Sequence, residues 1–282
     1  MEGDGNDVMI ANRRTSLSAW VADRLSANRL TFSREEAMRE SGIGHGAFLD
    51  AAERLQRRQH LVCPRRGFYV IVPPQFVSWG APPPSWYIDD LMRFERCAYY
   101  VGLFKAGEFH GATHQAVMEF QVVAGKRLPR LRVGRSLVAF HYRKDIAPVL
   151  QGVTRRNTQT GTMNVSSPEL TALDLLRRRY LAVGADSVAT ALADMGGKID
   201  GDELAVLSGS FEKPVAQRLG YLLERLGFAD QAAPLNAALS RRDPGWVELS
   251  PFKAIFTDIM PAPLERNRKW HVVTRHALEP DW

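Results

Sequence analysis

Residues 73–86, PPQFVSWGAPPPSW, contain five prolines and constrain the fold more than any other stretch of the chain. Proline has no amide hydrogen and a fixed φ, so neither a long helix nor a central strand continues through such a segment. The segment therefore predicts a stiff, extended linker. It divides the 282 residues into an N-terminal domain over 13–72 and a larger C-terminal domain over 87–282.

Periodic apolar residues predict three helices in the N-terminal domain. They recur at three- and four-residue steps over 16–27, which is the pattern of an amphipathic helix. Ser33 and Glu36 have the spacing of a capping box, so a second helix is expected to start at Ser33. A third helix is expected over 45–59, with its apolar residues on one face.

Two short apolar runs follow the third helix and predict a β-hairpin. They cover 61–63 and 68–72, and the turn sequence Pro64-Arg65-Arg66-Gly67 separates them. Three helices followed by a two-stranded hairpin is the element order of a winged helix-turn-helix. Such domains place the second helix of the helix-turn-helix pair in the major groove of DNA. We therefore predict a DNA-binding domain of this type over 13–72.

The C-terminal domain is expected to mix helices and strands. Strands are predicted at 119–123, 131–133, 137–142, 152–157, 161–165 and 270–274. Helices are predicted over 88–108 in two pieces, from 167 onward, and near 185–195, 202–208, 214–226 and 232–240. The fold class is thus α+β, with an N-terminal winged helix-turn-helix joined by a Pro-rich linker to a larger mixed α/β C-terminal domain.

The third helix is the main candidate for contact with DNA. Its inner face holds 48, 52 and 55, so Asp50, Arg54 and Arg57 share an outer stripe, with Arg58 beside it. Arginine can bind a guanine edge through two hydrogen bonds, while helix N-termini and hairpin cations suit phosphates. The predicted DNA-contacting residues are His45, Gly46, Asp50, Arg54, Arg57, Arg58, Arg65 and Arg66. The alternative interpretation is a cationic surface used for protein contacts.

The positive charge of the chain is concentrated in two stretches. The chain carries 37 Lys and Arg against 31 Asp and Glu, a formal net charge of +6. Residues 43–72 carry five arginines and two acids, and residues 126–156 carry nine cations and one acid. The cations of this second block are Lys126, Arg127, Arg130, Arg132, Arg135, Arg143, Lys144, Arg155 and Arg156.

The second block alternates cations with apolar residues in the manner of strands. Strand geometry would place several of these cations on one face of a sheet. Three interpretations are open: a second surface for DNA or RNA, a docking face for an acidic protein partner, and a solvated sheet face without a ligand.

The residues that could bind metals or cofactors are expected to have ordinary structural roles. Glu108, His110 and His114 are expected to pack, because Gly111 ends the helix between the two histidines. The Gly42-x-Gly44-x-x-Ala47 pattern follows a helix rather than a strand, so its glycines are expected to form the helix-turn-helix turn and not a dinucleotide site. We therefore expect no metal site, no cofactor and no enzymatic activity.

Bulk features place the chain in the cytoplasm. Only two cysteines occur, which is too few for a disulfide framework, and Cys63 is expected to be a small buried residue in a hairpin strand. The N-terminal residues lack the apolar core of a signal peptide, and no apolar run has the length of a membrane span. A membrane is therefore not expected as a partner.

Four sequence segments stand out in the order in which they occur. They are Arg65-Arg66-Gly67-Phe68-Tyr69-Val70, then Ala98-Tyr99-Tyr100-Val101-Gly102-Leu103 leading to His110-Gly111-Ala112-Thr113, then Val165-Ser166-Ser167-Pro168-Glu169-Leu170-Thr171-Ala172-Leu173-Asp174, and Arg218-Leu219-Gly220-Tyr221-Leu222-Leu223-Glu224. In this order they resemble the AbiEi family, the antitoxins and autoregulators of type IV toxin–antitoxin systems. The resemblance spans most of 15–275.

This resemblance implies a protein that represses its own operon by binding inverted repeats in double-stranded operator DNA. It also implies a functional partner, a nucleotidyltransferase-like toxin, which the C-terminal domain counters without necessarily forming a stable complex. Two alternatives stay open. In the first, the C-terminal domain is a metal-dependent nuclease, with Glu119 and Asp145 as the acids to consider. In the second, the protein is a stand-alone regulator without a toxin.

Overall fold

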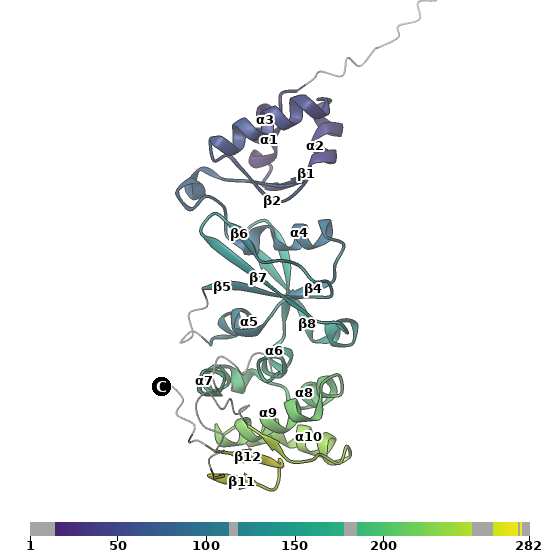
Figure 1. The fold of residues 1–282 in the computed structure, drawn as a ribbon, viewed down its shortest axis with the longest axis vertical. Coiled ribbons are helices and arrows are strands. Elements are labelled where there is room, and N and C mark those ends of the chain that lie inside the picture. The colour runs from purple at the N-terminus through teal and green to yellow at the C-terminus, as the bar shows by residue number, and fades with distance from the viewer. Residues whose placement is uncertain (1–14, 113–117, 178–184, 250–261, 276, 278–282) are drawn as a thin grey trace, which may run out of the picture. The chain divides into compact units, whose positions relative to one another are not determined.

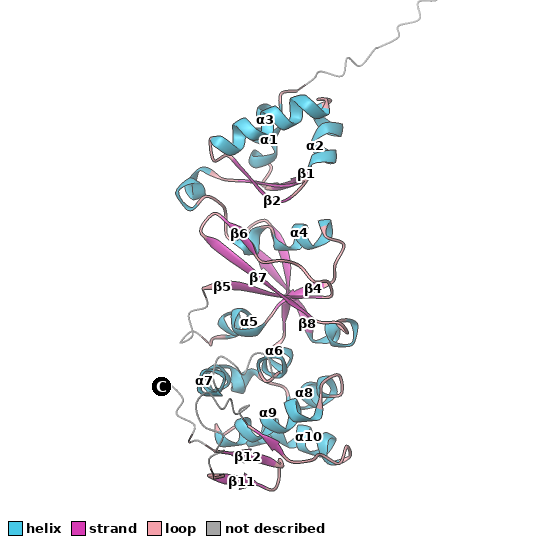
Figure 2. Cartoon of the chain, in the orientation of Figure 1, coloured by secondary structure: helices cyan, strands magenta, loops and turns pink. Residues whose placement is uncertain are grey.

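A computed structural model describes residues 15–112, 118–177, 185–249, 262–275 and 277 of the chain. Its helices and strands are labelled in Figure 1 and coloured by type in Figure 2. Two compact units emerge from the contacts between residues. Of the described residues, the first comprises 15–96 with the short segments Leu131–Ser136 and Thr158–Gly161, and the second comprises the remainder.

The first unit begins with three helices and a three-stranded sheet. The elements are α1 (Leu17–Ser26), β1 (Thr31–Ser33), α2 (Arg34–Ser41), α3 (His45–Arg57), β2 (Leu61–Arg65) and β3 (Phe68–Ile71). The strands are antiparallel in the order β1-β3-β2, and a bulge between Val62 and Arg65 interrupts the β2–β3 pairing. This is the element order expected for a winged helix-turn-helix, with β1 as an additional strand that the short Thr-Phe-Ser run did not reveal.

The capping box predicted for the second helix is present. The Ser33 hydroxyl accepts a hydrogen bond from the Glu36 amide at 3.0 Å, and the Glu36 carboxylate accepts one from the Ser33 amide at 3.3 Å. Gly42 then ends α2 with φ of +70°, a left-handed conformation that glycine adopts without steric cost. The glycines of this region therefore form a turn, as expected.

The remainder of the first unit is the Pro-rich segment and the elements around it. Two short 3₁₀ helices, η1 (Pro74–Trp79) and η2 (Pro84–Trp86), are followed by α4 (Ile88–Phe94). Strand β6 (Leu131–Val133) lies beside β2. The 158–161 turn is held by hydrogen bonds from Asn28 to the Gln159 carbonyl at 2.8 Å and from Thr160 to the Trp86 carbonyl at 2.6 Å.

The second unit combines a twisted sheet with helices. Its sheet strands are β4 (Tyr99–Val101), β5 (Glu119–Ala124), β7 (Ser136–Tyr142), β8 (Val153–Thr158) and β9 (Gly161–Ser166), neighbours in the order β7-β5-β4-β9-β8. The β5–β7 and β4–β9 pairs are parallel, and β4–β5 is antiparallel. Helix α5 (Leu103–His110) and the 3₁₀ helix η3 (Ala147–Gly152) belong to the connections.

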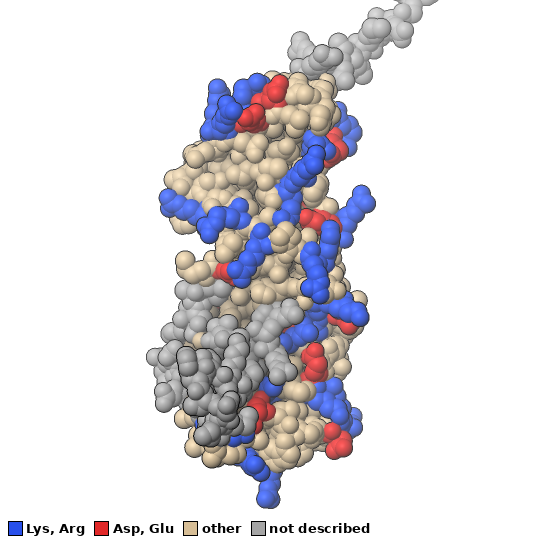
Figure 3. Space-filling view, in the orientation of Figure 1, with Lys and Arg blue, Asp and Glu red and all other residues tan. Residues whose placement is uncertain are grey.

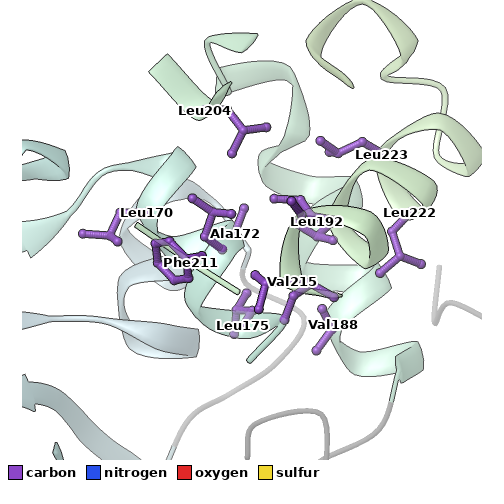
Figure 4. Packing of buried hydrophobic residues seen from close by; sticks show 14 of the residues in the cluster. Leu170, Ala172, Leu175, Val188, Leu192, Leu204, Phe211, Val215, Leu222 and Leu223 are labelled. Atoms are coloured by element: carbon purple, nitrogen blue, oxygen red, sulfur yellow. The ribbon is translucent and has the colours of Figure 1, made fainter. Parts of the chain in front are cut away.

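The C-terminal helices bury a large apolar core. They are α6 (Pro168–Leu175), α7 (Ala185–Met195), α8 (Gly201–Ser208), α9 (Lys213–Arg225) and α10 (Ala229–Ser240), with the 3₁₀ helix η5 (Gly196–Lys198) after α7. Figure 4 shows side chains from α6, α7, α8 and α9 meeting in this core. A small sheet follows, with β12 (Val272–Thr274) between β10 (Val247–Glu248) and β11 (Glu265–Asn267).

The predicted helices and strands of the second unit are confirmed apart from their ends and a few short elements. The prediction of a helix over 88–108 broken in two was incomplete, because Tyr99–Val101 forms strand β4 between α4 and α5. Aromatic and β-branched residues favour strands, but three residues are too few to show a period of two. Strands β10 and β11 were missed for the same reason.

Helix α9 holds the small C-terminal sheet through the sequence segment over residues 218–224. Arg218 donates from Nε to the Glu248 carbonyl at 2.8 Å, and Trp270 donates from its indole nitrogen to Glu224 at 2.9 Å. Gly220 leaves room for the Trp270 ring, since a Cβ built there would lie 2.0 Å from the ring atom Cζ3. Trp270 is fully buried in this position.

We expect Gly220→Ala to destabilise the protein by about 1–3 kcal/mol, because the added methyl group must displace Trp270 from a packed core. Gly245→Ala is the matched control, since a Cβ there meets nothing within 4 Å, and it should change the free energy of unfolding by no more than about 0.5 kcal/mol. Chemical denaturation measures both. Equal stability of the two variants would contradict the packing described for Trp270.

Candidate nucleic-acid interface

Helix α3 is oriented by an aromatic contact with the hairpin. Phe48 is fully buried, and its ring meets that of Tyr69 in β3 edge-to-face with 5.4 Å between centroids. Ala52 and Leu55 follow on the same face and are also buried. The inner face predicted from the sequence is thus confirmed, and the remaining positions of α3 are exposed apart from the half-buried Ala51 and Gln56.

A buried arginine ties the first helix to the second. Arg24 is 8% exposed, and its guanidinium donates to the Thr31 carbonyl at 2.7 Å and lies 2.9 Å from the Glu36 carboxylate. Because Glu36 also completes the capping box, this ion pair fixes the start of α2 relative to α1. Arg24 follows the buried Trp20 and Val21 by four and three positions, so helix periodicity places it on the inner face of α1. Its partner Glu36 lies in the next helix, so no local pattern predicts the ion pair.

The outer face of α3 carries the predicted arginines in exposed positions. Asp50, Arg54, Arg57 and Arg58 are exposed. Arg57 pairs with Glu53 one turn earlier at 2.6 Å, whereas no ion pair of Arg54 or Arg58 occurs within the residues that the structure describes. In Figure 3, basic side chains crowd the end of the first unit where Figure 1 places α1 and α3, with acidic ones among them.

The N-terminus of α3 is open to solvent. Gly44 is its N-cap, no side chain caps it, and both His45 and Gly46 are exposed. A Cβ at Gly44 or Gly46 would meet nothing within 4 Å, so packing inside the protein does not require glycine at either position. Uncapped amides with free space in front of them can accept an anion such as a phosphate.

The two cations of the hairpin differ in their surroundings. Arg65 pairs with Glu95 at 3.1 Å, and its side chain is only 17% exposed. Arg66 is exposed in the turn, and the ring of Phe68 packs against Phe94 in α4 at 5.3 Å. Of the two predicted wing contacts, only Arg66 therefore presents its side chain to solvent.

Cys63 was expected to be buried, and this expectation is wrong. The residue is exposed, and its thiol lies 3.0 Å from the Arg65 carbonyl. The bulge between Val62 and Arg65 is the physical reason, because it breaks the regular alternation of inward and outward side chains in β2.

The second basic block does not form one face of a sheet. Arg132 and Arg135 lie in the 131–136 segment of the first unit, whereas the other cations of the block belong to the second unit. Arg155 and Arg156 are neighbours in β8, so they point to opposite sides of this strand. A stretch that is contiguous in the sequence is therefore divided between the two units.

Several cations of the block have partners within the second unit. Arg130 pairs with Glu119 at 3.3 Å, the Arg127 guanidinium lies 4.5 Å from the centre of the Tyr142 ring, and that of Arg156 lies 4.7 Å from the Phe109 ring. Lys126, Arg127, Arg130, Lys144, Arg155 and Arg156 are all exposed. Arginines stacked on aromatic rings keep a fixed position while their donors stay accessible.

Arg143 was expected on the basic surface and is instead buried. Its side chain is 6% exposed, its Nη1 donates to Asp174 at 2.9 Å, and its guanidinium lies 4.4 Å from the centre of the Phe211 ring. It also donates to the carbonyls of Asp145 at 3.1 Å and Ser210 at 3.3 Å. Arg143 thus holds a carboxylate inside the core and is not a surface cation.

Asp174 is the acid at the centre of this buried network. The Tyr100 hydroxyl donates to its Oδ2 at 2.6 Å, while Arg143 binds Oδ1. Burial raises the pKa of the Asp174 carboxyl, and the charge of Arg143 and the hydrogen bond from Tyr100 act in the opposite direction. With both oxygens bonded, the buried carboxylate does not depend on water.

The other polar residues of α6 are also satisfied inside the protein. Ser167 caps the helix by accepting from the Leu170 amide at 3.3 Å. Glu169 accepts from the Asp200 amide at 2.8 Å, just before α8, and the hydroxyls of Thr171 and Ser166 lie 2.6 Å apart. The sequence segment over residues 165–174 therefore ends in a helix that is buried on all sides, with a partner for each polar side chain.

The histidine considered as a metal ligand has a structural role. Nε2 of His110 lies 2.7 Å from the Ser166 carbonyl, burial lowers the pKa of the ring, and Gly111 ends α5 with φ of +106°. His114 lies outside the described residues. Within the described ranges, no three His, Cys, Asp or Glu side chains gather as metal ligands would.

The helices of the described residues are short. Helices α3 and α9 have 13 residues each. In the described part of the chain, no helix combines the length and apolar character that a bilayer crossing needs.

Comparison with known proteins identifies the domain that contains the buried network. Residues 100–225 match the family described as the AbiEi antitoxin C-terminal domain. Residues 100–225 belong to the AbiEi antitoxin family. The family resemblance expected from the sequence is thus confirmed over these residues, and the match supports an antitoxin role in a toxin–antitoxin system.

A solved structure shares the fold of nearly the whole chain. The crystal structure of the RV2827C protein from Mycobacterium tuberculosis is similar with a TM-score of 0.63 and 17% sequence identity. The similarity covers 93% of this chain and 92% of that chain. No curated protein sequence matches the chain. At this identity the likeness establishes the α+β fold, in which an N-terminal helical region precedes the larger AbiEi domain.

We expect Arg143→Ala to destabilise the AbiEi domain by about 3–5 kcal/mol, since it leaves the Asp174 carboxylate buried without its cation. Arg241→Ala is the control, because Arg241 is an exposed arginine of the same unit, and its removal should cost no more than about 0.5 kcal/mol. Urea denaturation followed by circular dichroism measures both. A small effect at Arg143 would mean that it is not the partner of Asp174.

Proposed function

We propose that this protein is a DNA-binding repressor that regulates its own operon and acts as the antitoxin of that operon. In this proposal the domain over residues 13–72 binds inverted repeats in the operator, and two copies occlude the promoter. The AbiEi domain antagonises a toxin of the nucleotidyltransferase type, with or without a stable complex between the two proteins. Both activities would take place in the cytoplasm, and neither requires catalysis by this chain.

The observation that carries the DNA-binding part is the exposed face of α3. Three helices, with a turn between the second and the third, precede the hairpin in winged-helix order. Arg54 and Arg57 on the third helix, and Arg58 at its end, are exposed to solvent. Residues 54–88 contain five arginines and no acid, so the negative Glu53 stands at the edge of a cationic stretch. An exposed arginine on a recognition helix is the side chain best suited to reading a guanine edge.

The antitoxin part rests on the family of residues 100–225. That the toxin belongs to the type IV class is a more specific proposal, since the family match by itself supports only an antitoxin role. A reading frame for a nucleotidyltransferase-like protein next to this gene would support it. A neighbouring gene of another kind would favour the stand-alone regulator instead.

We expect Arg54→Ala and Arg57→Ala each to weaken binding to operator DNA by about 1–3 kcal/mol for every base-specific hydrogen-bonded pair that the substitution removes. Fluorescence anisotropy with a duplex from upstream of the gene measures the Kd, and a scrambled duplex of equal length measures non-specific binding. The affinity for the operator should fall by more than the affinity for the scrambled duplex, because only the operator presents the recognised bases.

Glu53→Ala is the control on the same face of α3. It removes a negative charge and releases Arg57 from its ion pair, so binding should be unchanged or tighter. If Arg54→Ala and Arg57→Ala keep wild-type affinity while their melting temperatures match the wild type, α3 is not the recognition helix. A variant that carries both Arg54→Ala and Arg57→Ala should still protect cells from the co-expressed toxin. This result would separate antitoxin activity from repression.

A further inference from the structure

The 131–136 segment is an unexpected part of the first unit. The Arg135 amide donates to the Trp79 carbonyl at 3.0 Å, and β6 lies beside β2 (Figure 1). Gly134 makes the closest approach: it has φ of +57°, and a Cβ there would lie 2.3 Å from the Trp79 oxygen. Glycine is required at this position for both reasons, so the segment is firmly attached to the residues that follow the hairpin.

The segment presents two arginines to solvent. Leu131 and Val133 are buried while Arg132 between them is exposed, as strand alternation requires, and Arg135 is exposed in the turn. The Arg135 guanidinium lies 5.8 Å from the centre of the Trp79 ring, whose residue is 57% exposed. Among the described residues neither arginine forms an ion pair, and 131–136 contains no acid.

These arginines lie beside the predicted wing. Strand β2 is the edge strand in the order β1-β3-β2, and β6 is the element beside it in the first unit. Within the hairpin itself, Arg65 is engaged by Glu95, so Arg66 is the exposed cation. The 131–136 segment therefore supplies cations next to a wing that has few of its own.

We propose that Arg132 and Arg135 bind the phosphate backbone of the DNA duplex held by the first unit, so that the 131–136 segment acts as a second wing. This inference rests on the proposed DNA binding and adds a contact surface to it. Arginine is suited to phosphate because its planar guanidinium donates two parallel hydrogen bonds. Backbone contacts of this kind add affinity without sequence preference.

The test is the salt dependence of DNA binding by the full-length protein. Anisotropy titrations with the operator duplex and the scrambled duplex, over a series of salt concentrations, give the slope of log K against log salt. The Arg132→Ala/Arg135→Ala double variant should have a shallower slope by about 0.9 for each phosphate that is no longer neutralised. It should weaken binding to both duplexes by the same factor.

Two further variants make the result specific. Arg241→Ala/Arg268→Ala removes two exposed arginines of the second unit and should leave the slope unchanged. Arg132→Lys/Arg135→Lys keeps the charge and should retain most of the slope. Thermal melting of each variant checks that the fold is intact.

The outcomes separate this proposal from the one on which it rests. A wild-type slope in the Arg132→Ala/Arg135→Ala variant, with operator binding intact, overturns the second wing and leaves the recognition helix in place. An equal decrease in the Arg241→Ala/Arg268→Ala control also overturns it, because the effect would then follow total charge. If the wild-type protein binds neither duplex, both proposals fail.

Discussion

The carboxylate of Asp174 lies inside the core of the second unit, and the surrounding elements are arranged to satisfy it. Arg143, from the segment after β7, and Tyr100, from β4, each bind one of its oxygens. A charged pair in this position gains its stability from complete hydrogen bonding, since removing either ion from water is costly. The network therefore links the sheet to helix α6, on which the other C-terminal helices pack.

Helix α6 shows how a fully buried helix can carry polar residues. Its acids and hydroxyls bond to the amide before α8, to the end of β9 and to the sheet. Each bond joins α6 to a different element, so the helix orders its surroundings as well as filling space. This accounts physically for the polar residues of the 166–174 segment, which lies within the residues that match the AbiEi family.

The first unit uses a smaller set of contacts to fix a surface. The ion pair of Arg24 with Glu36 and the contact of Phe48 with Tyr69 hold α2 and α3 against the hairpin. What these contacts leave exposed is the arginine face of α3, together with the open N-terminus of that helix. The 131–136 segment, far from these residues in the sequence, adds two exposed arginines to the same unit.

Most helices and strands could be predicted from the amino-acid sequence alone, because their signals are local. The Ser33–Glu36 capping box, the Ser167–Pro168 helix start and the inner face of α3 all depend on residues within a few positions of each other. Three-residue strands such as β1 and β4 were missed, since they are too short to show a period.

Which cations of the 126–156 block reach solvent, and in which unit, depends instead on the three-dimensional fold. Arg143 looks like its neighbours in the sequence, and it is buried because Asp174, thirty-one positions away, requires a partner. Arg132 and Arg135 belong to the first unit because Gly134 permits a close approach to the Trp79 carbonyl. The charges can be counted along the sequence, but whether a cation is exposed or buried in an ion pair depends on long-range contacts that no local pattern contains.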